Sequence, residues 1–242
     1  MDLVETPEIH AVIISWEGYG PSARSLAERV APAVTRLSVI YSNRAGSPET
    51  GPGDWISVPD TAFFGAKFRR ALDAYAGGIL LLIHADTAFA DWPALVDRCR
   101  GLFGRHADLG IWSPDFTHTP FPNRRVWTGK GPGRGLITVA FPDGIVVALR
   151  EEVVRWLQTL DYSENNLGWG IIWAAVANAL NRNLLVCRDT RMTVEHAAGS
   201  GYDSTDASRQ RDIFLSQLPA DDRRRIDDLW TLIRTPKKQR KP

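Results

Sequence analysis

The sequence predicts an α/β fold in which a mixed, mostly parallel central sheet is flanked by helices. Through the first half of the chain, short apolar runs alternate with amphipathic segments long enough to form helices. This order is typical of βαβ units, which build parallel sheets. The run at residues 79–83 (ILLLI) is apolar without interruption, as expected for a strand whose two faces are both covered by helices.

The first half of the chain contains four predicted strands and two predicted helices. The strands are short apolar runs that end in polar or Gly/Pro-rich segments, and they lie at residues 10–16, 36–43, 54–59 and 79–86. The helices are expected at residues 22–34 and 61–78. The second helix carries Phe64, Phe68, Leu72 and Tyr75 on one face and ends at two glycines, which commonly terminate helices.

The second half of the chain has a different pattern. Residues 136–149 (LITVAFPDGIVVAL) are expected to form a pair of strands with Pro142-Asp143-Gly144 at or near the turn. Residues 117–135, which are rich in Gly, Pro and Arg, are expected to form a long loop. The remaining predicted strands are 108–116 and 184–189, and the remaining predicted helices are 91–106, 150–161, 171–183, 206–218 and 220–234.

Composition favours a globular protein of the cytoplasm. The net charge of +1 among 242 residues argues against a dedicated nucleic-acid-binding protein. The two cysteines have no metal-site spacing and suit a reducing compartment. No apolar run is long enough to cross a bilayer. The basic residues 235–242 (TPKKQRKP) suggest a weak peripheral contact with the inner face of a membrane.

Two side chains that bind metals follow the most apolar predicted strand. His84 and Asp86 stand at its carboxyl end, and ligands of open α/β sheets bind beyond the carboxyl ends of the strands. A carboxylate is a suitable ligand for Mg²⁺ or Mn²⁺, whose other positions can be taken by substrate phosphates, and a histidine suits Mn²⁺ better. The sequence therefore predicts a divalent-metal site at this edge of the sheet.

The βαβ pattern, the helix that ends in Gly-Gly and the segment ILLLIHAD together resemble the nucleotide-binding half of family 2-type GT-A glycosyltransferases. In that family an Asp-x-Asp motif follows the strand and holds a metal under a nucleoside diphosphate. Here the motif reads His84-Ala85-Asp86, so the resemblance implies that Asp86 is the retained metal ligand. It also implies that His196, at the end of a late strand, joins the metal or the diphosphate, with His84 assisting. The implied cofactor is Mn²⁺ or Mg²⁺.

The same resemblance implies a set of donor-binding residues. The donor would be a nucleoside-diphosphate sugar, with a UDP-sugar favoured. Ser15 and Glu17 follow the first strand, where the family holds the base and ribose. Lys67 lies in the helix before the motif, and Trp169 in NNLGWG offers an aromatic face to a sugar. Asn43 and Asp54, at the end of the second strand and the start of the third, correspond to groups that bind uracil and ribose.

The acceptor side departs from the family pattern. Inverting members carry an acidic general base shortly after a Gly-Trp-Gly segment. Here Gly168-Trp169-Gly170 is followed by Ile171, Ile172 and Trp173, and isoleucine cannot transfer a proton. Three alternatives stay open: Asp143 or Glu164 reaches the acceptor, the enzyme uses a retaining mechanism, or the domain binds a nucleotide sugar or glycan without turnover.

The resemblance covers roughly residues 9–205 and implies a glycosyltransferase. The expected organisation is one GT-A-like domain (1–225), with a nucleotide-binding half at about 9–115 and an acceptor half at about 116–205. A C-terminal helix and basic tail would follow (226–242). The expected acceptor is a glycan of the cell envelope, a lipid-linked acceptor or another hydroxyl compound. A sugar nucleotidyltransferase is a further alternative, but SWEGYGPSAR is a poor match to the Gly-rich, Arg-containing loop of that class.

Overall fold

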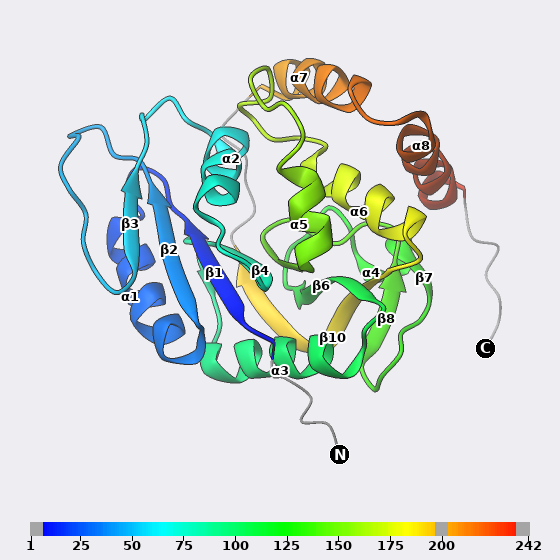
Figure 1. Cartoon of the computed structure of the whole chain (residues 1–242), viewed down its shortest axis with the longest axis horizontal. Coiled ribbons are helices and arrows are strands. Elements are labelled where there is room, and N and C mark those ends of the chain that lie inside the picture. The colour runs from blue at the N-terminus through cyan, green and yellow to red at the C-terminus, as the bar shows by residue number, and fades with distance from the viewer. Residues whose placement is uncertain (1–6, 197–202, 236–242) are drawn as a thin grey trace.

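The computed structural model of the chain describes residues 7–196 and 203–235, and its strands form one sheet (Figure 1). Along the sheet the order is β3-β2-β1-β4-β9-β6-β10-β8-β7, and β5 pairs with one end of β10. The strands are β1 (Ile9–Ile14), β2 (Arg36–Tyr41), β3 (Asp54–Ser57), β4 (Ile79–His84), β5 (Thr87–Ala88), β6 (Leu109–Phe116), β7 (Trp127–Lys130), β8 (Leu136–Val139), β9 (Val146–Leu149) and β10 (Leu185–His196).

The sheet is mixed and mostly parallel, as the sequence predicts. Strands β3, β2, β1 and β4 are parallel neighbours. Strand β9 is antiparallel to both β4 and β6, so β6 runs in the same direction as β4. Strand β10 is parallel to β6, while β8 is antiparallel to β10. Because only β9 and β8 oppose this direction along the path, most strands end at the same edge.

Helices cover both faces of the sheet (Figure 1). Helices α1 and α3 pack on one face, with Leu26, Leu95 and Trp92 among the buried residues. Helices α2, α5 and α6 pack on the other, and α7 and α8 lie outside α6. The helices are α1 (Gly20–Val30), α2 (Phe64–Ala74), α3 (Trp92–Arg105), α4 (Asn123–Val126), α5 (Glu151–Leu157), α6 (Ile171–Asn181), α7 (Ser204–Ser216) and α8 (Ala220–Arg234).

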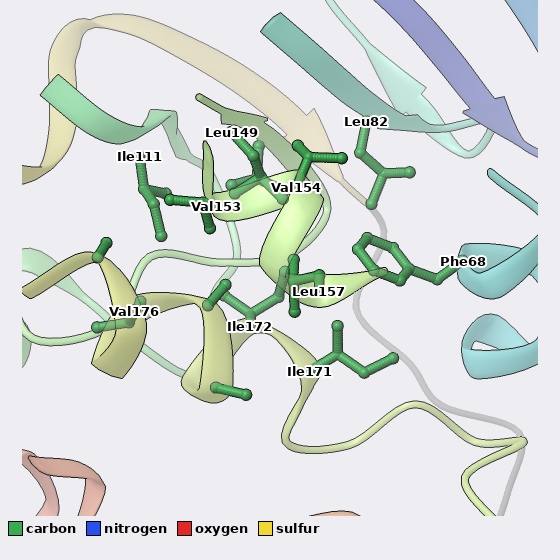
Figure 2. Packing of buried hydrophobic residues seen from close by; sticks show 14 of the residues in the cluster. Phe68, Leu82, Ile111, Leu149, Val153, Val154, Leu157, Ile171, Ile172 and Val176 are labelled. Atoms are coloured by element: carbon green, nitrogen blue, oxygen red, sulfur yellow. The ribbon is translucent and has the colours of Figure 1, made fainter. Parts of the chain in front are cut away.

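The larger core lies between the sheet and the α2, α5 and α6 layer, as Figure 2 shows. Phe68 of α2 meets Leu157 of α5 and Ile171 of α6 beside Leu82 of β4. Complete burial of each such side chain stabilises the fold by about 1.5–3 kcal/mol. Ile172, the position that follows the Gly-Trp-Gly segment, belongs to the same cluster and is only 8% exposed.

Three expectations about the second half need correction. Residues 136–149 do not form a hairpin, because β8 pairs with β10 and β7 whereas β9 inserts between β4 and β6. The segment 117–135 is not a plain loop, since it contains α4 and β7. Helix α8 also runs across residue 225, so the expected boundary there falls within one helix whose Ile226 and Leu229 join the main core.

None of the helices in the described part of the chain is long and apolar enough to span a bilayer. The proposed membrane contact depends on the basic tail, and residues 236–242 of that tail lie outside the described residues.

His10 in β1 is a buried histidine at the edge of the sheet opposite the carboxyl ends. Its Nε2 lies 2.9 Å from Ser38 Oγ, and its Nδ1 accepts a hydrogen bond from the backbone N–H of Ala76. The ring is stacked on Tyr75. Burial, with a smaller contribution from Arg36, lowers the pKa of His10 below 6.5. The folded protein therefore holds the imidazole of His10 in its neutral form.

This burial predicts a pH-dependent loss of stability. The unfolded chain takes up a proton on His10 near pH 6.5, whereas the folded chain does so only at lower pH. The stabilisation that neutral His10 gives to the folded state is therefore complete above about pH 6.5. It declines as the pH falls from there through the folded-state pKa. The melting temperature of the wild type is expected to fall more steeply below pH 6.5 than that of His10→Asn. Equal slopes for the two proteins would contradict this assignment.

Candidate functional site

The candidate site lies at the edge of the sheet where β1, β2 and β4 end. Ile14 is in register with Ile40 and with His84, so the segments that follow these three strands emerge together. The backbone N–H of Ser15 donates to the carbonyl of Ile40, and that of Ala85 donates to the carbonyl of Ile14. The loops after the three strands therefore lie together at this edge.

Asp86 and His196 meet at this edge although they are far apart in the sequence. The short strand β5 pairs with β10 so that Thr87 lies opposite His196. Asp86 Oδ2 is 3.3 Å from His196 Nε2, and both side chains are largely buried. The hydrogen bond to Asp86 raises the pKa of His196. Burial disfavours the Asp86 carboxylate, but the bond from His196 and the charge of His84 hold its pKa below the ordinary value.

His84 lies in an aromatic enclosure. Its ring centroid is 5.0 Å from Trp16, in an edge-on arrangement, and 5.2 Å from Phe64 at the start of α2. Burial lowers the pKa of His84 to about 4, against an opposing effect of Asp86. The imidazole is therefore neutral at physiological pH, which is the form that accepts a hydrogen bond or binds a metal.

Several polar atoms at this edge are buried and have no hydrogen-bond partner within the described part of the chain. They are Ser15 Oγ, Asn43 Oδ1, His84 Nε2 and Asp86 Oδ1. Buried polar atoms are nearly always paired, so unpaired ones call for an explanation such as a bound water, ion or ligand. Each of these four residues is one that the sequence pattern predicts to bind donor or metal.

The donor set fits a metal only when substrate oxygens complete the coordination. In residues 7–196 and 203–235 no group of three His, Cys, Asp or Glu side chains is placed to hold an ion. The Asp86 carboxylate keeps one unpaired oxygen, and His196 lies beside it. Mg²⁺ and Mn²⁺ are commonly held by one or two protein ligands together with substrate phosphates, and the residues here match that kind of site.

Lys67 is not the exposed helical lysine that its sequence position also allows. It is fully buried, and its Nζ donates to the Ser15 carbonyl at 2.7 Å and to Ser42 Oγ at 2.9 Å. The ammonium group also lies 5.1 Å from the centre of the Trp16 ring. Burial lowers the pKa of Lys67 to about 8. Lys67 therefore joins the ends of β1 and β2 and places a positive charge directly beneath the candidate site.

Two other predicted donor-binding residues lie at the same edge. Glu17 Oε2 accepts the backbone N–H of Arg44 at 2.7 Å, which links the loops after β1 and β2. Asn43 donates through Nδ2 to the carbonyl of Ser47 and so orders the second loop.

The prediction that Asp54 binds the donor needs correction, because Asp54 lies at the opposite edge of the sheet. It begins β3 and is in register with Ser38 near the start of β2. Its charge acts on His10, which lies near the start of β1. The parallel direction of β3 places the first residue of the strand away from the carboxyl ends. Ser57, which ends β3, is the residue of that strand nearest the site.

Trp169 lies in a linker that packs on the start of α2. Gly168 and Gly170, on either side of it, have φ values of +80° and +88°, a backbone region that favours glycine. The backbone N–H of Gly65 donates to the carbonyl of Asn166, and that of Phe63 donates to Asn166 Oδ1. This contact places the half-buried Trp169 segment next to Phe64, which touches His84.

The contact between α2 and the linker predicts a large effect for Gly65→Ala. A Cβ at Gly65 would lie 1.7 Å from the backbone oxygen of Asn165, so the two segments must separate. We expect a loss of about 1–3 kcal/mol or more in the free energy of unfolding, measured by chemical denaturation. Gly101→Ala in α3 is the matched control, because its Cβ would meet only the flexible end of Arg105. If both variants unfold alike, the packing described here is wrong.

Asp143, one of the two predicted catalytic carboxylates, is buried where the charge of His196 acts on it. It is 7% exposed, and Thr119 Oγ1 donates to its Oδ2 at 2.5 Å. Burial raises the pKa of Asp143, while Thr119 and the charges of Arg188 and His196 act in the opposite direction. The side chain of Ile172 packs against Gly144, the residue after Asp143. A Cβ added at Gly144 would lie 2.9 Å from Cγ1 of Ile172. Asp143 therefore lies next to the place that Ile172 fills.

Glu164, the other predicted catalytic carboxylate, is exposed in the linker between α5 and α6. Trp16, Phe64, Thr119 and Arg188 contribute to the site but are not predicted as binding residues by the sequence. Their roles depend on contacts between distant strands. For example, Arg188 of β10 lowers the pKa of Asp143, which lies just before β9, because β10 and β9 both pair with β6.

No family model and no curated protein matches the sequence, whereas solved structures do match the fold. The mannosyltransferase PcManGT from Pyrobaculum calidifontis, in complex with GDP-Man and Mn²⁺, is 13% identical with a TM-score of 0.57, over 93% of this chain and 70% of that one. Glucosyl-3-phosphoglycerate synthase from Mycobacterium tuberculosis, in complex with Mn²⁺, UDP and phosphoglyceric acid, is 14% identical with a TM-score of 0.53, over 96% and 80%.

A UDP-glucose pyrophosphorylase complexed with UDP-glucose is also similar, at 10% identity and a TM-score of 0.52, over 87% of this chain and 100% of that one. At these identities the likeness concerns the fold, and one fold serves several reactions. The order of strands, the edge at which the polar residues gather and these structural matches lead to one conclusion: the chain has the GT-A glycosyltransferase fold.

Proposed function

We propose that this protein is a metal-assisted glycosyltransferase that moves a sugar from a nucleoside-diphosphate sugar, with a UDP-sugar favoured, to a hydroxyl acceptor. The observation that carries the proposal is the gathering of unpaired buried polar atoms, with the Asp86–His196 pair, at the carboxyl edge of a GT-A sheet. The structural matches support it, because two of them are transferases bound to a nucleotide and Mn²⁺. The expected class of acceptor remains a glycan or a lipid-linked compound.

In this proposal different residues at this edge of the sheet bind different parts of the donor. Ser15, Glu17 and Asn43 lie on the loops after β1 and β2 and hold the nucleoside. Lys67 keeps these two strand ends together and adds positive charge beneath the diphosphate. His84, neutral in its aromatic enclosure, presents Nε2 to the donor or to the metal.

Asp86 and His196 would hold a divalent cation together with diphosphate oxygens. When bound, the cation supplies positive charge that stabilises the nucleoside diphosphate as it leaves. Asp86 stays ionised because its pKa is held low. Trp169 would close the sugar side of the site with its indole face.

Asp143 is the stronger candidate for the general base. It is buried near His196 and has a raised pKa, which makes the carboxylate a better proton acceptor near neutral pH. It lies beside Ile172, at the place where the family resemblance leads one to look for an acidic residue. Glu164 is exposed and stays a second candidate.

The test is a screen of nucleoside-diphosphate sugars with the full chain. Binding is followed by calorimetry in Mn²⁺ and in chelator, and release of the nucleoside diphosphate is followed with simple glycosides as acceptors. The proposal expects binding of one donor that requires Mn²⁺, and release that the acceptor stimulates. If no donor of the panel binds, the proposal is wrong.

The burial of Ile172 in the core favours one second candidate, a domain that binds a nucleotide sugar without turnover. The same screen separates the two functions. Metal-dependent binding with neither hydrolysis nor transfer, for every acceptor tried, would favour the binding domain. Formation of a nucleoside-diphosphate sugar from a triphosphate and a sugar phosphate would instead favour a nucleotidyltransferase.

A further inference from the structure

Arg188 of β10 is a buried arginine whose hydrogen bonds are incomplete. It is 0% exposed. Its Nη1 donates to the carbonyl of Phe121 at 2.7 Å and to Asn123 Oδ1 at 2.9 Å. Its Nε and Nη2 are buried and have no hydrogen-bond partner among the residues that the structure describes. Ser113, its register partner on β6, has an unpaired buried hydroxyl as well.

Partly exposed polar groups surround this arginine. Asp115 Oδ1 lies 3.7 Å from Arg188 Nη1, and the Asp115 side chain is 24% exposed. Asn123 bridges the two, since its Nδ2 donates to Asp115 Oδ2 at 2.8 Å. Thr119 Oγ1 donates to Asp143 and accepts the backbone N–H of Phe121, whose carbonyl accepts the bond from Arg188. The polar cluster of Asp115, Thr119, Asn123 and Arg188 therefore lies next to the carboxylate that we propose as the base.

Folding alone does not account for this arrangement. A buried donor without a partner costs about 1–3 kcal/mol, and well-packed apolar residues in place of both members of a buried ion pair often leave a fold as stable or more stable. The unpaired donors are accounted for if another molecule pairs with them. A hydroxyl group can both donate and accept, so it can bond the partly exposed Asp115 and reach the buried Arg188 through one water.

We propose that Asp115, Thr119, Asn123 and Arg188 form the acceptor subsite, and that this subsite takes a neutral, polyhydroxylated compound such as a sugar. The inference rests on the proposed transferase function and goes beyond it by naming the residues that bind the acceptor and by excluding anionic acceptors. The charges select against an anion. One guanidinium faces two carboxyl groups, Asp115 and Asp143, so these residues themselves offer no net positive charge to a phosphate or carboxylate. The exposed Arg124 and Arg125 follow Asn123 in α4 and are the nearest cations in the sequence. Arg188 acts as a positioning residue that holds Asn123 from beneath.

The first test measures which acceptors bind to the full chain. Methyl α-glucopyranoside and methyl α-mannopyranoside are compared with their 6-phosphates by saturation-transfer NMR and calorimetry. At least one neutral glycoside is expected to bind, and its 6-phosphate at least tenfold more weakly. Preference for the phosphates, or no binding of either neutral glycoside, overturns the proposal.

The second test separates a positioning role from a structural one. Arg188→Met is expected to weaken binding of the neutral glycoside at least tenfold. It also lowers the melting temperature, because it leaves the buried Asp143 without the arginine's charge. Arg98→Met is the contrasting variant, because Arg98 pairs with the fully buried Asp189, which follows Arg188 in β10 and so points to the other face of the sheet. It is expected to lower the melting temperature and leave glycoside binding unchanged. If Arg188→Met lowers the melting temperature and leaves binding intact, Arg188 is structural and the proposal fails.

Asp115→Asn is the conservative second variant and changes one atom. It is expected to weaken glycoside binding at least tenfold without altering the Mn²⁺-dependent affinity for the donor. A wild type that binds no donor refutes the transferase proposal itself. A wild type that binds donor normally, with Asp115→Asn and Arg188→Met both binding glycoside like the wild type, refutes only the acceptor subsite.

Discussion

Replacing Asp86 with asparagine is expected to abolish the metal dependence of donor binding and to lower turnover about 10²–10³-fold or more, the range seen when a group that stabilises developing charge is removed. The side chain keeps its size and can still accept the hydrogen bond from His196. The change therefore removes the negative charge and leaves the packing almost unaltered. Calorimetry of the donor with Mn²⁺ and with chelator measures the first effect, and release of the nucleoside diphosphate measures the second.

Asp73→Asn is the matched control for this variant. Asp73 is an exposed carboxylate in α2 that pairs with Arg69 on the helix surface, so its replacement is expected to change neither quantity. The interpretation of Asp86 is wrong if Asp86→Asn binds the donor in Mn²⁺ as tightly as the wild type does.

Replacing Asp143 with asparagine is the second change for which we expect a large effect. General-base catalysis contributes about 10²–10⁴-fold, and the rate of transfer is expected to fall by that factor while the affinity for the donor stays the same. The reason is geometric, since Asp143 precedes β9, and β4 separates β9 from β1 and β2 in the sheet. Single-turnover transfer rates, compared with the dissociation constant of the donor, test the expectation.

Glu164→Gln decides between the two carboxylates. The exposed position of Glu164 leads us to expect a transfer rate close to that of the wild type. A large loss in Glu164→Gln, together with normal transfer in Asp143→Asn, would transfer the role of base to Glu164. Normal transfer in both variants would favour a retaining mechanism, in which no such base is needed.

The fold could be predicted from the sequence mainly where contacts are local or follow a strong pattern. The run 79–83 identifies the central strand, and the facing residues Phe68 and Leu72 identify α2. Parallel β1, β2 and β4 then place Ser15, Asn43 and His84 at one edge without any further information.

The remainder depends on pairings between residues distant in the sequence. The segment 136–149 has the alternation and the turn residues of a hairpin. Nevertheless β9 pairs with β4 and β6 instead of with β8, because the burial that β9 gains between those two strands outweighs the local preference for a turn. The family resemblance predicts Asp54 at the site, but the parallel direction of β3 puts this first residue of the strand at the opposite edge. The burial of Lys67 and Arg188 has no sequence signal, since each is surrounded by segments from other parts of the chain.

The most direct measurement of the central claim is the position of Mn²⁺ in crystals of the full chain grown with Mn²⁺ and a nucleoside diphosphate, located by anomalous diffraction. We predict a peak within about 2.0–2.6 Å of an Asp86 oxygen, with diphosphate oxygens completing the coordination and His196 adjacent. Mn²⁺ at another place, or a nucleotide bound away from the ends of β1, β2 and β4, would contradict the account.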